Sequence, residues 1–171
     1  MMDWRKDYYS GAKGVYFFAI LKRIIALAEL GRRDVVVLDF GCGTGRLSQL
    51  LPGKVIGYDV ISELSDVDDW RTTKFDVVVA NEVFYLLTAA QLTEFLAELR
   101  ALNPSAELVV GISRQGILNK ILKNLAGEPD AHEGTQLWPN EQLKILNQNL
   151  ELLGRTSVFQ LCDVYHMRFR A

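Results

Sequence analysis

Three glycines and one aspartate form the part of this sequence that is best suited to hold a ligand. The glycines are Gly41, Gly43 and Gly45, and Asp39 precedes them. Glycine tolerates a positive φ and lacks the Cβ that would keep a ligand away from the backbone. The dinucleotide fingerprint has glycines as its first, third and sixth residues, whereas the sixth residue here is Arg46. Asp39 would repel a pyrophosphate, so the pattern favours a ligand that carries an ammonium or a sulfonium group.

These glycines lie between a predicted strand and a predicted helix. The run Val35–Leu38 is apolar and mostly β-branched, which indicates a buried strand, and Arg46–Leu51 is typical of a short helix. A ligand at this turn would lie against bare backbone at a helix N-terminus. The string LDFGCGTG resembles the first motif of class I S-adenosylmethionine (SAM) dependent methyltransferases. The alternative is a purely structural strand-to-helix turn.

Asp59 is the second candidate for cofactor binding. It ends a predicted strand, Lys54–Asp59, twenty residues after Asp39. A carboxylate at the end of the second parallel strand is placed to accept hydrogen bonds from ribose hydroxyls. The resemblance implies that contact with the ribose of SAM. The alternative is a solvated loop aspartate or a helix N-cap.

The stretch after Asp59 departs from the family's pattern. Only fifteen residues, Val60–Lys74, precede the next strand, whereas the helix and third strand usual in the family need roughly twenty or more. We therefore expect the third strand to be missing or vestigial. An acidic linker would replace it, and the second strand would lie at or near the edge of the sheet.

This linker also contains the nearest candidates for an adenine pocket. In the family, an acidic residue after the third strand contacts the adenine amino group, and an apolar neighbour packs on the ring. Asp68, Asp69 and Trp70 are the nearest matches, and an indole can stack on adenine. Trp70 could equally be a hydrophobic plug over an edge of the sheet.

A further strand, Phe75–Ala80, precedes the segment NEVFYLL. Together they resemble the family's fourth motif, whose turn borders both SAM and substrate. Asn81 could bind the amino group of SAM or cap the turn, and Tyr85 could face the substrate or lie in the core. The turn lacks the (N/D)PP(Y/F) sequence of methyltransferases that act on exocyclic or amide nitrogens.

The rest of the chain predicts the other elements of an α/β fold. Apolar spacing indicates a helix over Val15–Leu30 that covers one face of the sheet, and Tyr8, Tyr9 and Tyr16 could form a lid over the ligand. The later elements expected are a helix opened by the capping box Thr88–Gln91, a strand at Glu107–Ile112, helices at Gly116–Leu125 and from Pro139 to Gly154, and a hairpin of Thr156–Cys162 and Val164–Arg170.

The expected architecture is a Rossmann-like, mostly parallel sheet with helices on both faces and a C-terminal antiparallel hairpin. At 171 residues the chain is long enough to bury a core. We expect residues 1–171 to form a single SAM-binding methyltransferase domain, in which residues 1–31 are a helical cover.

Composition narrows the classes of partner. A formal net charge of −2 gives no general attraction to nucleic acid. Cys42 and Cys162 are too few for a disulfide framework or a metal cluster. No unbroken apolar stretch is long enough to span a membrane. The sequence thus predicts a cytoplasmic protein without a nucleic-acid partner, and it leaves the oligomeric state open.

Methyl transfer requires few catalytic side chains. The reaction is an in-line displacement with a good leaving group, so an enzyme mainly aligns the reacting atoms and removes a proton where the acceptor requires it. His132 is the best candidate base, because small-molecule methyltransferases of the ubiquinone-biosynthesis-like group often have a histidine in this loop. The alternative is a surface-loop histidine.

The resemblance is closest to the small-molecule, type-11 group. It implies SAM-dependent methylation of a small-molecule acceptor. A catalytically silent SAM-binding regulator or complex subunit is the alternative, and the trimmed linker favours it. A nicotinamide-dependent enzyme is disfavoured by Arg46 and Asp39.

Overall fold

The computed structural model describes residues 11–114 and 135–170. A six-stranded sheet runs through this part of the chain in the order β2-β1-β3-β4-β6-β5. Its strands are β1 (Val37–Phe40), β2 (Val55–Tyr58), β3 (Val77–Asn81), β4 (Glu107–Ser113), β5 (Leu150–Val158) and β6 (Cys162–Phe169). The first four in spatial order are parallel, whereas β6 pairs antiparallel with both β4 and β5.

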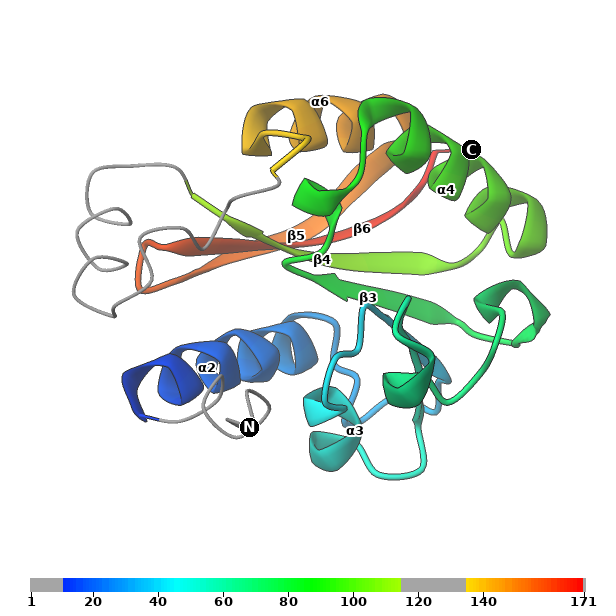
Figure 1. Cartoon of the computed structure of the whole chain (residues 1–171). Helices are drawn as coiled ribbons and strands as arrows, with labels where there is room; N and C mark the ends of the chain where they lie inside the picture. The colour runs from blue at the N-terminus through cyan, green and yellow to red at the C-terminus, as the bar shows by residue number, and fades with distance from the viewer. Residues whose placement is uncertain (1–10, 115–134, 171) are drawn as a thin grey trace.

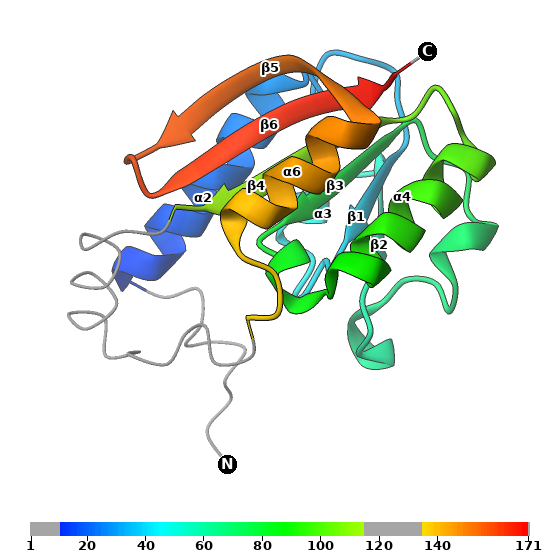
Figure 2. The ribbon, with the colours of Figure 1, turned by 90° about the horizontal axis from the view of Figure 1, so that it is seen from above.

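Helices cover both faces of this sheet (Figure 1). On one face lie α4 (Ala89–Leu102) and α6 (Pro139–Asn149), and on the other lie α2 (Gly11–Leu27) and α3 (Arg46–Leu50). The predicted Rossmann-like, mostly parallel sheet with helices on both faces and a C-terminal antiparallel hairpin, β5–β6, is confirmed (Figure 2).

The alternation of side chains along the strands divides the core between these two layers. In β3, Val78 and Ala80 pack toward α4 and α6, whereas Val77 and Val79 pack toward α2 and α3. This follows from the two-residue period of a strand. Because both faces of the parallel strands are buried, those strands are nearly continuous apolar runs.

The linker Val60–Lys74 contains no strand, as the sequence predicts. It forms two single turns of 3₁₀ helix, η1 (Ser62–Leu64) and η2 (Trp70–Thr72), and β2 is an edge strand. Asp66 covers part of that edge. Its N–H donates to the carbonyl of Gly57 at 2.8 Å, and its Oδ2 accepts from the N–H of Gly57 at 2.7 Å. One acidic residue thus pairs with β2 where a third strand would.

Several boundaries differ from those expected. The hairpin strands are Leu150–Val158 and Cys162–Phe169 rather than Thr156–Cys162 and Val164–Arg170, so Cys162 begins the second strand instead of ending the first. Helix α2 ends at Leu27 rather than at Leu30, and α6 ends at Asn149, so Leu150 and Gly154 belong to β5. Leu150 pairs with Phe169 at the end of β6, and this long hairpin takes residues that also fit a helical pattern. The predicted capping box is confirmed, because Thr88 Oγ1 accepts from the N–H of Gln91 at 3.2 Å. The predicted helix Gly116–Leu125 lies outside the described residues.

None of the helices in the described ranges is long and apolar enough to cross a membrane.

Candidate cofactor and acceptor site

A cavity of about 470 Å³ opens where β1, β2 and β3 end. Its wall is formed by Asp39–Gly43, Tyr58–Val60 and Asn81–Val83, and Phe17 and Leu21 of α2 close one side. The chain leaves β1 toward β2 on one side and returns to β3 on the other. This is a switch point of the topology, where open α/β sheets bind their ligands. The volume is within the range of small-molecule sites.

The glycine turn presents bare backbone to this cavity. Gly41, Gly43 and Gly45 have φ values of 80°, 52° and 69°, in the left-handed region that favours glycine. A Cβ at Gly41 would clash with the side chain of Val83. Gly41 and Gly43 line the cavity, whereas Gly45 lies outside its wall and precedes α3.

Asp39 is buried at the end of β1 and lines the same cavity. Burial raises the pKa of its carboxyl group to about 7, and the negative charges of Asp59 and Asp66 act in the same direction. A nearby cation would reverse this effect, because an opposite charge favours the ionised carboxylate. The site is therefore suited to the positively charged ligand that the sequence predicts.

Asp59 follows β2 and joins the glycine turn to the linker. Its Oδ2 accepts from the N–H of Gly43 at 3.0 Å, and its Oδ1 accepts from the N–H of Ile61 at 3.0 Å. A carboxylate has about four acceptor positions, so both oxygens retain capacity for further hydrogen bonds. Asp59 can thus hold the turn and still accept from a ligand.

Asn81 and Glu82 form the opposite wall, at the end of β3. In the described part of the chain, Oδ1 of Asn81 is buried without a hydrogen-bond partner. Glu82 has a φ of 57°, and its Oε1 accepts from the hydroxyl of Ser113 at 2.7 Å. Sequence reasoning did not single out Glu82, because nothing in the sequence indicates its left-handed backbone.

An aromatic pair, also missed from the sequence, lines the cavity beside Asp59. The rings of Phe40 and Tyr58 stack with centroids 5.5 Å apart. Phe40 lies between Asp39 and Gly41, and Tyr58 directly precedes Asp59. Their position next to predicted cofactor-binding residues was the signal in the sequence that could have identified them.

Trp70 lies behind that pair rather than in the cavity wall. Its side chain is 2% exposed and packs edge-on against Phe40, with ring centroids 6.0 Å apart, and against Phe95 at 5.3 Å. This position corresponds to the hydrophobic plug, the second of its two predicted roles. Such a buried indole offers almost no surface to adenine.

The other predicted residues lie away from the cavity wall or outside the described chain. Asp68 is exposed, and Asp69 accepts from the N–H of Arg71 to cap η2. Tyr85 is half-buried, and its carbonyl accepts from the N–H of Gln136. His132, Tyr8 and Tyr9 lie outside the described residues.

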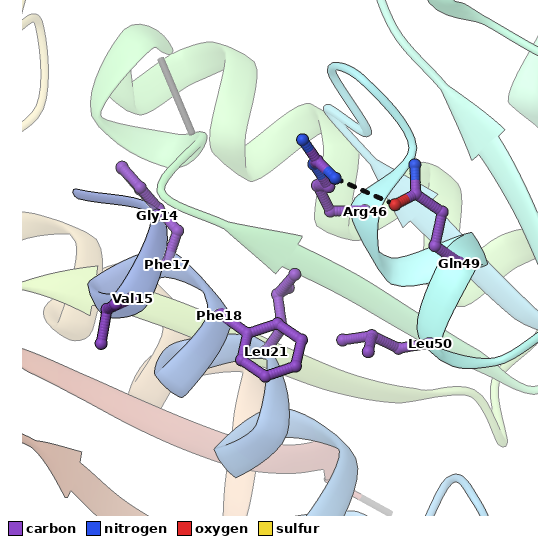
Figure 3. A pocket seen from close by; sticks show the side chains of 8 residues that line it. All are labelled: Gly14, Val15, Phe17, Phe18, Leu21, Arg46, Gln49 and Leu50. Atoms are coloured by element: carbon purple, nitrogen blue, oxygen red, sulfur yellow. Dashed lines mark hydrogen bonds between the residues drawn. The ribbon is translucent and has the colours of Figure 1, made fainter. Parts of the chain in front are cut away.

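A second hollow of about 360 Å³ adjoins the cavity between α2 and α3 (Figure 3). It is mostly apolar and shares Phe17, Leu21 and Arg46 with the cavity. Nη1 of Arg46 donates to Oε1 of Gln49 at 3.1 Å on its rim. Within the described ranges, no three acidic, histidine or cysteine side chains are grouped to hold a metal ion.

Comparison with known families agrees with this geometry. Residues 15–152 match the family described as "Methyltransferase domain". The chain belongs to this methyltransferase family. The predicted class I, SAM-dependent relationship is confirmed, and SAM is the cofactor that this family uses. No protein of curated function matches the sequence significantly.

Solved structures with low sequence identity to this chain share the fold. The magnesium protoporphyrin IX methyltransferase of Synechocystis PCC 6803, solved with S-adenosylhomocysteine (SAH) bound, is 18% identical with a TM-score of 0.62, over 98% of this chain and 93% of that one. The N-methyltransferase NodS of Bradyrhizobium japonicum WM9 is 18% identical with a TM-score of 0.58, over 90% and 97%. A protein of Pyrococcus horikoshii OT3 is 16% identical with a TM-score of 0.68, over 95% and 93%.

Proposed function

We propose that this methyltransferase-family chain binds SAM in the cavity at the ends of β1–β3 and methylates a small-molecule acceptor there. The observation that carries the proposal is the combination of a bare glycine turn with the buried carboxyl group of Asp39. Bare backbone accommodates a ligand at contact distance. A buried carboxyl group among other acids is costly unless a cation accompanies it. We propose further that residues 1–171 act as one domain.

Each part of the cavity wall suits a different part of the cofactor. Asp39 would face the positively charged methionyl part, beside Gly41 and Gly43. Asp59 would accept from the ribose hydroxyls, as a carboxylate with free acceptor positions can. Phe40 and Tyr58 would pack on the adenine, in place of Trp70. Asn81 lines the opposite wall, and its side chain would contact the amino group of SAM.

The protein's work in the reaction would be alignment and exclusion of water. SAM supplies an activated methyl group, and the cavity wall has to hold the acceptor in line with it. Phe17, Leu21, Leu86 and Leu87 give this cavity an apolar side that would limit access of water. His132 stays a candidate base by its type and loop position alone.

Isothermal titration calorimetry with SAM, SAH and NAD tests the proposal. SAM and SAH should bind with one site per chain, and NAD should not bind. Gly41→Ala should abolish binding of both, because its methyl group would displace Val83 from the wall. Binding of NAD alone, or no binding of SAM, would contradict the proposal.

A catalytically silent SAM-binding protein is the second candidate. The observation that favours it is the short linker, which leaves Asp68 and Trp70 outside the cavity wall. Incubation with methyl-labelled SAM and a low-molecular-weight cell extract separates the two. Label transferred to a small molecule supports the methyltransferase, whereas tight SAM binding without any transfer supports the silent protein.

A further inference from the structure

Glu82 has a backbone conformation that its residue type does not favour. Its φ of 57° lies in the left-handed region, which costs a non-glycine residue about 1–3 kcal/mol. The N–H of Glu82 donates to the carbonyl of Gly111 at 3.0 Å, which fixes the turn against β4. Such strain persists where surrounding structure enforces it, and it is common at ligand sites.

The side chain of Glu82 is held in place as well as its backbone. Its Oε1 accepts from the Ser113 hydroxyl at 2.7 Å. Tyr16 of α2 and Cys162 of β6 lie beside the same pair, and burial together with the charge of Glu82 raises the pKa of both. Groups from α2, β4 and β6 thus surround a carboxylate that lines the cavity.

Charge on the cavity wall is predominantly negative. Among the described lining residues, the ionisable acids are Asp39, Asp59 and Glu82, and the base is Arg46. Asp39 and Asp59 follow β1 and β2, beside the glycine turn that would hold the cofactor. Glu82 follows β3, on the opposite wall, away from the residues that are proposed to hold the cofactor.

We propose that Glu82 faces the position of the transferred methyl group and that the acceptor is an amine whose N–H hydrogen-bonds to this carboxylate. The inference rests on the proposed function and adds the class of acceptor to it. A carboxylate accepts hydrogen bonds and donates none, so it can orient an N–H while the lone pair of the nitrogen points at the methyl group.

The proposed methyl transfer from SAM to the amine needs no further reactant. The nitrogen lone pair of the neutral amine forms a bond to the methyl carbon, and the carbon–sulfur bond breaks. Its electron pair stays on sulfur, which becomes a neutral thioether. The positive charge passes to nitrogen next to Glu82, and the N–H proton then leaves to the carboxylate or to water.

Electrostatics distinguishes an amine from the other common acceptors. Positive charge moves toward Glu82 as an amine is methylated, and a fixed negative charge stabilises that transition state. A phenolate or a carboxylate acceptor would instead bring a further negative charge beside Glu82, Asp39 and Asp59. The wall therefore favours amines over anionic acceptors.

Sinefungin tests the inference without knowledge of the acceptor. In this SAM analogue a carbon bearing a primary amine replaces the methylsulfonium, so an ammonium occupies the position of the transferred methyl. SAH has no charge at that position. Calorimetric titration of the unmodified protein should show sinefungin binding about tenfold or more tightly than SAH.

The variant Glu82→Gln should remove that preference. The amide keeps the shape of the side chain and an oxygen for Ser113, so SAH affinity should stay within about twofold while sinefungin loses about tenfold or more. Glu63→Gln is the matched control, because Glu63 is an exposed linker residue outside the cavity wall. It should leave both affinities unchanged.

The outcomes separate this inference from the proposed function. Failure of SAH to bind the unmodified protein would contradict the proposed function itself. Normal SAH binding without a preference for sinefungin would overturn the role of Glu82 alone, and so would a preference that survives in Glu82→Gln. Because the first of these measurements uses the unmodified protein, the inference stays testable even where the variant does not fold.

Discussion

The carboxyl group of Asp39 lies in a position where ionisation is energetically unfavourable. It is buried, and burial together with the charges of Asp59 and Asp66 raises its pKa to about 7. In the unfolded chain it would ionise near its ordinary pKa of about 4. The folded protein thus keeps a proton that the unfolded chain has lost, and stability falls as pH rises between these values. A cationic ligand would remove this penalty.

We therefore expect cofactor binding to expel the proton of Asp39. SAH affinity should increase by up to about tenfold per pH unit from about pH 5.5 to about pH 7 and then level off. Calorimetry in buffers of different ionisation enthalpy would detect the released proton. Asp39→Asn should abolish the proton release, weaken SAH, and raise the melting temperature of the free protein above pH 7.

The exposed Asp68 provides the control for that experiment. Asp68→Asn should leave both the pH dependence of SAH binding and the melting temperature unchanged, because a solvated carboxylate has a similar environment in the folded and unfolded chain. A pH dependence that persists in Asp39→Asn would assign the proton to another group.

Asp59 should contribute to binding and to stability at once. Asp59→Ala should weaken SAM by about 2–4 kcal/mol, because two charge-assisted hydrogen bonds to the ribose would be lost. It should also cost about 1 kcal/mol of folding free energy, since the N–H groups of Gly43 and Ile61 lose their acceptor. Calorimetry and urea unfolding measure the two effects, and Asp59→Asn should be milder in both.

Glu63→Ala is the comparison for Asp59, because it truncates an exposed acid of the same linker. It should change SAM affinity by well under about 1 kcal/mol. If Asp59→Ala bound SAM as well as the unmodified protein does, the ribose would lie elsewhere.

At the scale of elements, the order and type of the strands could be predicted because their patterns are strong. The apolar runs of β1 and β3 and the Thr88–Gln91 cap each depend on local sequence. The missing strand followed from length alone, since fifteen residues are too few for a helix and a strand. Among the predicted site residues, Asp39, Gly41, Gly43, Asp59 and Asn81 do line one cavity.

The features that could not be predicted depend on tertiary context. Burial of Trp70 against Phe40 and Phe95 is decided by where α4 lies, and the linker's sequence contains no information on this. The left-handed φ of Glu82 accompanies a backbone hydrogen bond to Gly111 on the neighbouring strand, a contact that is distant in sequence. Leu150 fits both a helix and a strand, and pairing with Phe169 decides between them.

Asp66 illustrates the same limit, because its sequence position suggests only a solvated linker charge. The structure pairs it with Gly57 on the open edge of β2. Asp66→Ala should cost about 1–2 kcal/mol in urea unfolding, because the N–H of Gly57 loses a charged acceptor. The exposed edge should also promote self-association, measurable by sedimentation velocity. Asp68→Ala should do neither, and equal effects from the two variants would contradict the capping role.

At the scale of the whole molecule, one end of the sheet forms the cavity and the other end contains stabilising polar contacts. The carboxyl ends of β1–β3 surround the cavity with the buried carboxyl group of Asp39, bare glycine backbone and the strained turn at Glu82. The opposite end of β4 holds a satisfied network, in which Glu107 accepts from Arg33 at 2.5 and 3.1 Å and lies 2.8 Å from Nε2 of His166. This separation predicts that stability can be changed at one end without an effect on binding at the other.

Glu107→Gln tests that separation. Burial alone would raise the pKa of Glu107, but the hydrogen bonds from Arg33 and His166 outweigh it and lower the pKa. The resulting stability is present above the unfolded pKa of about 4.3 and is lost as pH falls through the lower folded pKa. At neutral pH the variant should lose about 1–2 kcal/mol in urea unfolding, a range reduced for the partial exposure of the pair. The difference from the unmodified protein should shrink below about pH 4, while SAH affinity at neutral pH stays unchanged.

Glu151→Gln, which removes the exposed pair with Arg168, should cost less than about 0.5 kcal/mol. A loss of SAH affinity in Glu107→Gln would show that the two ends of the sheet are coupled.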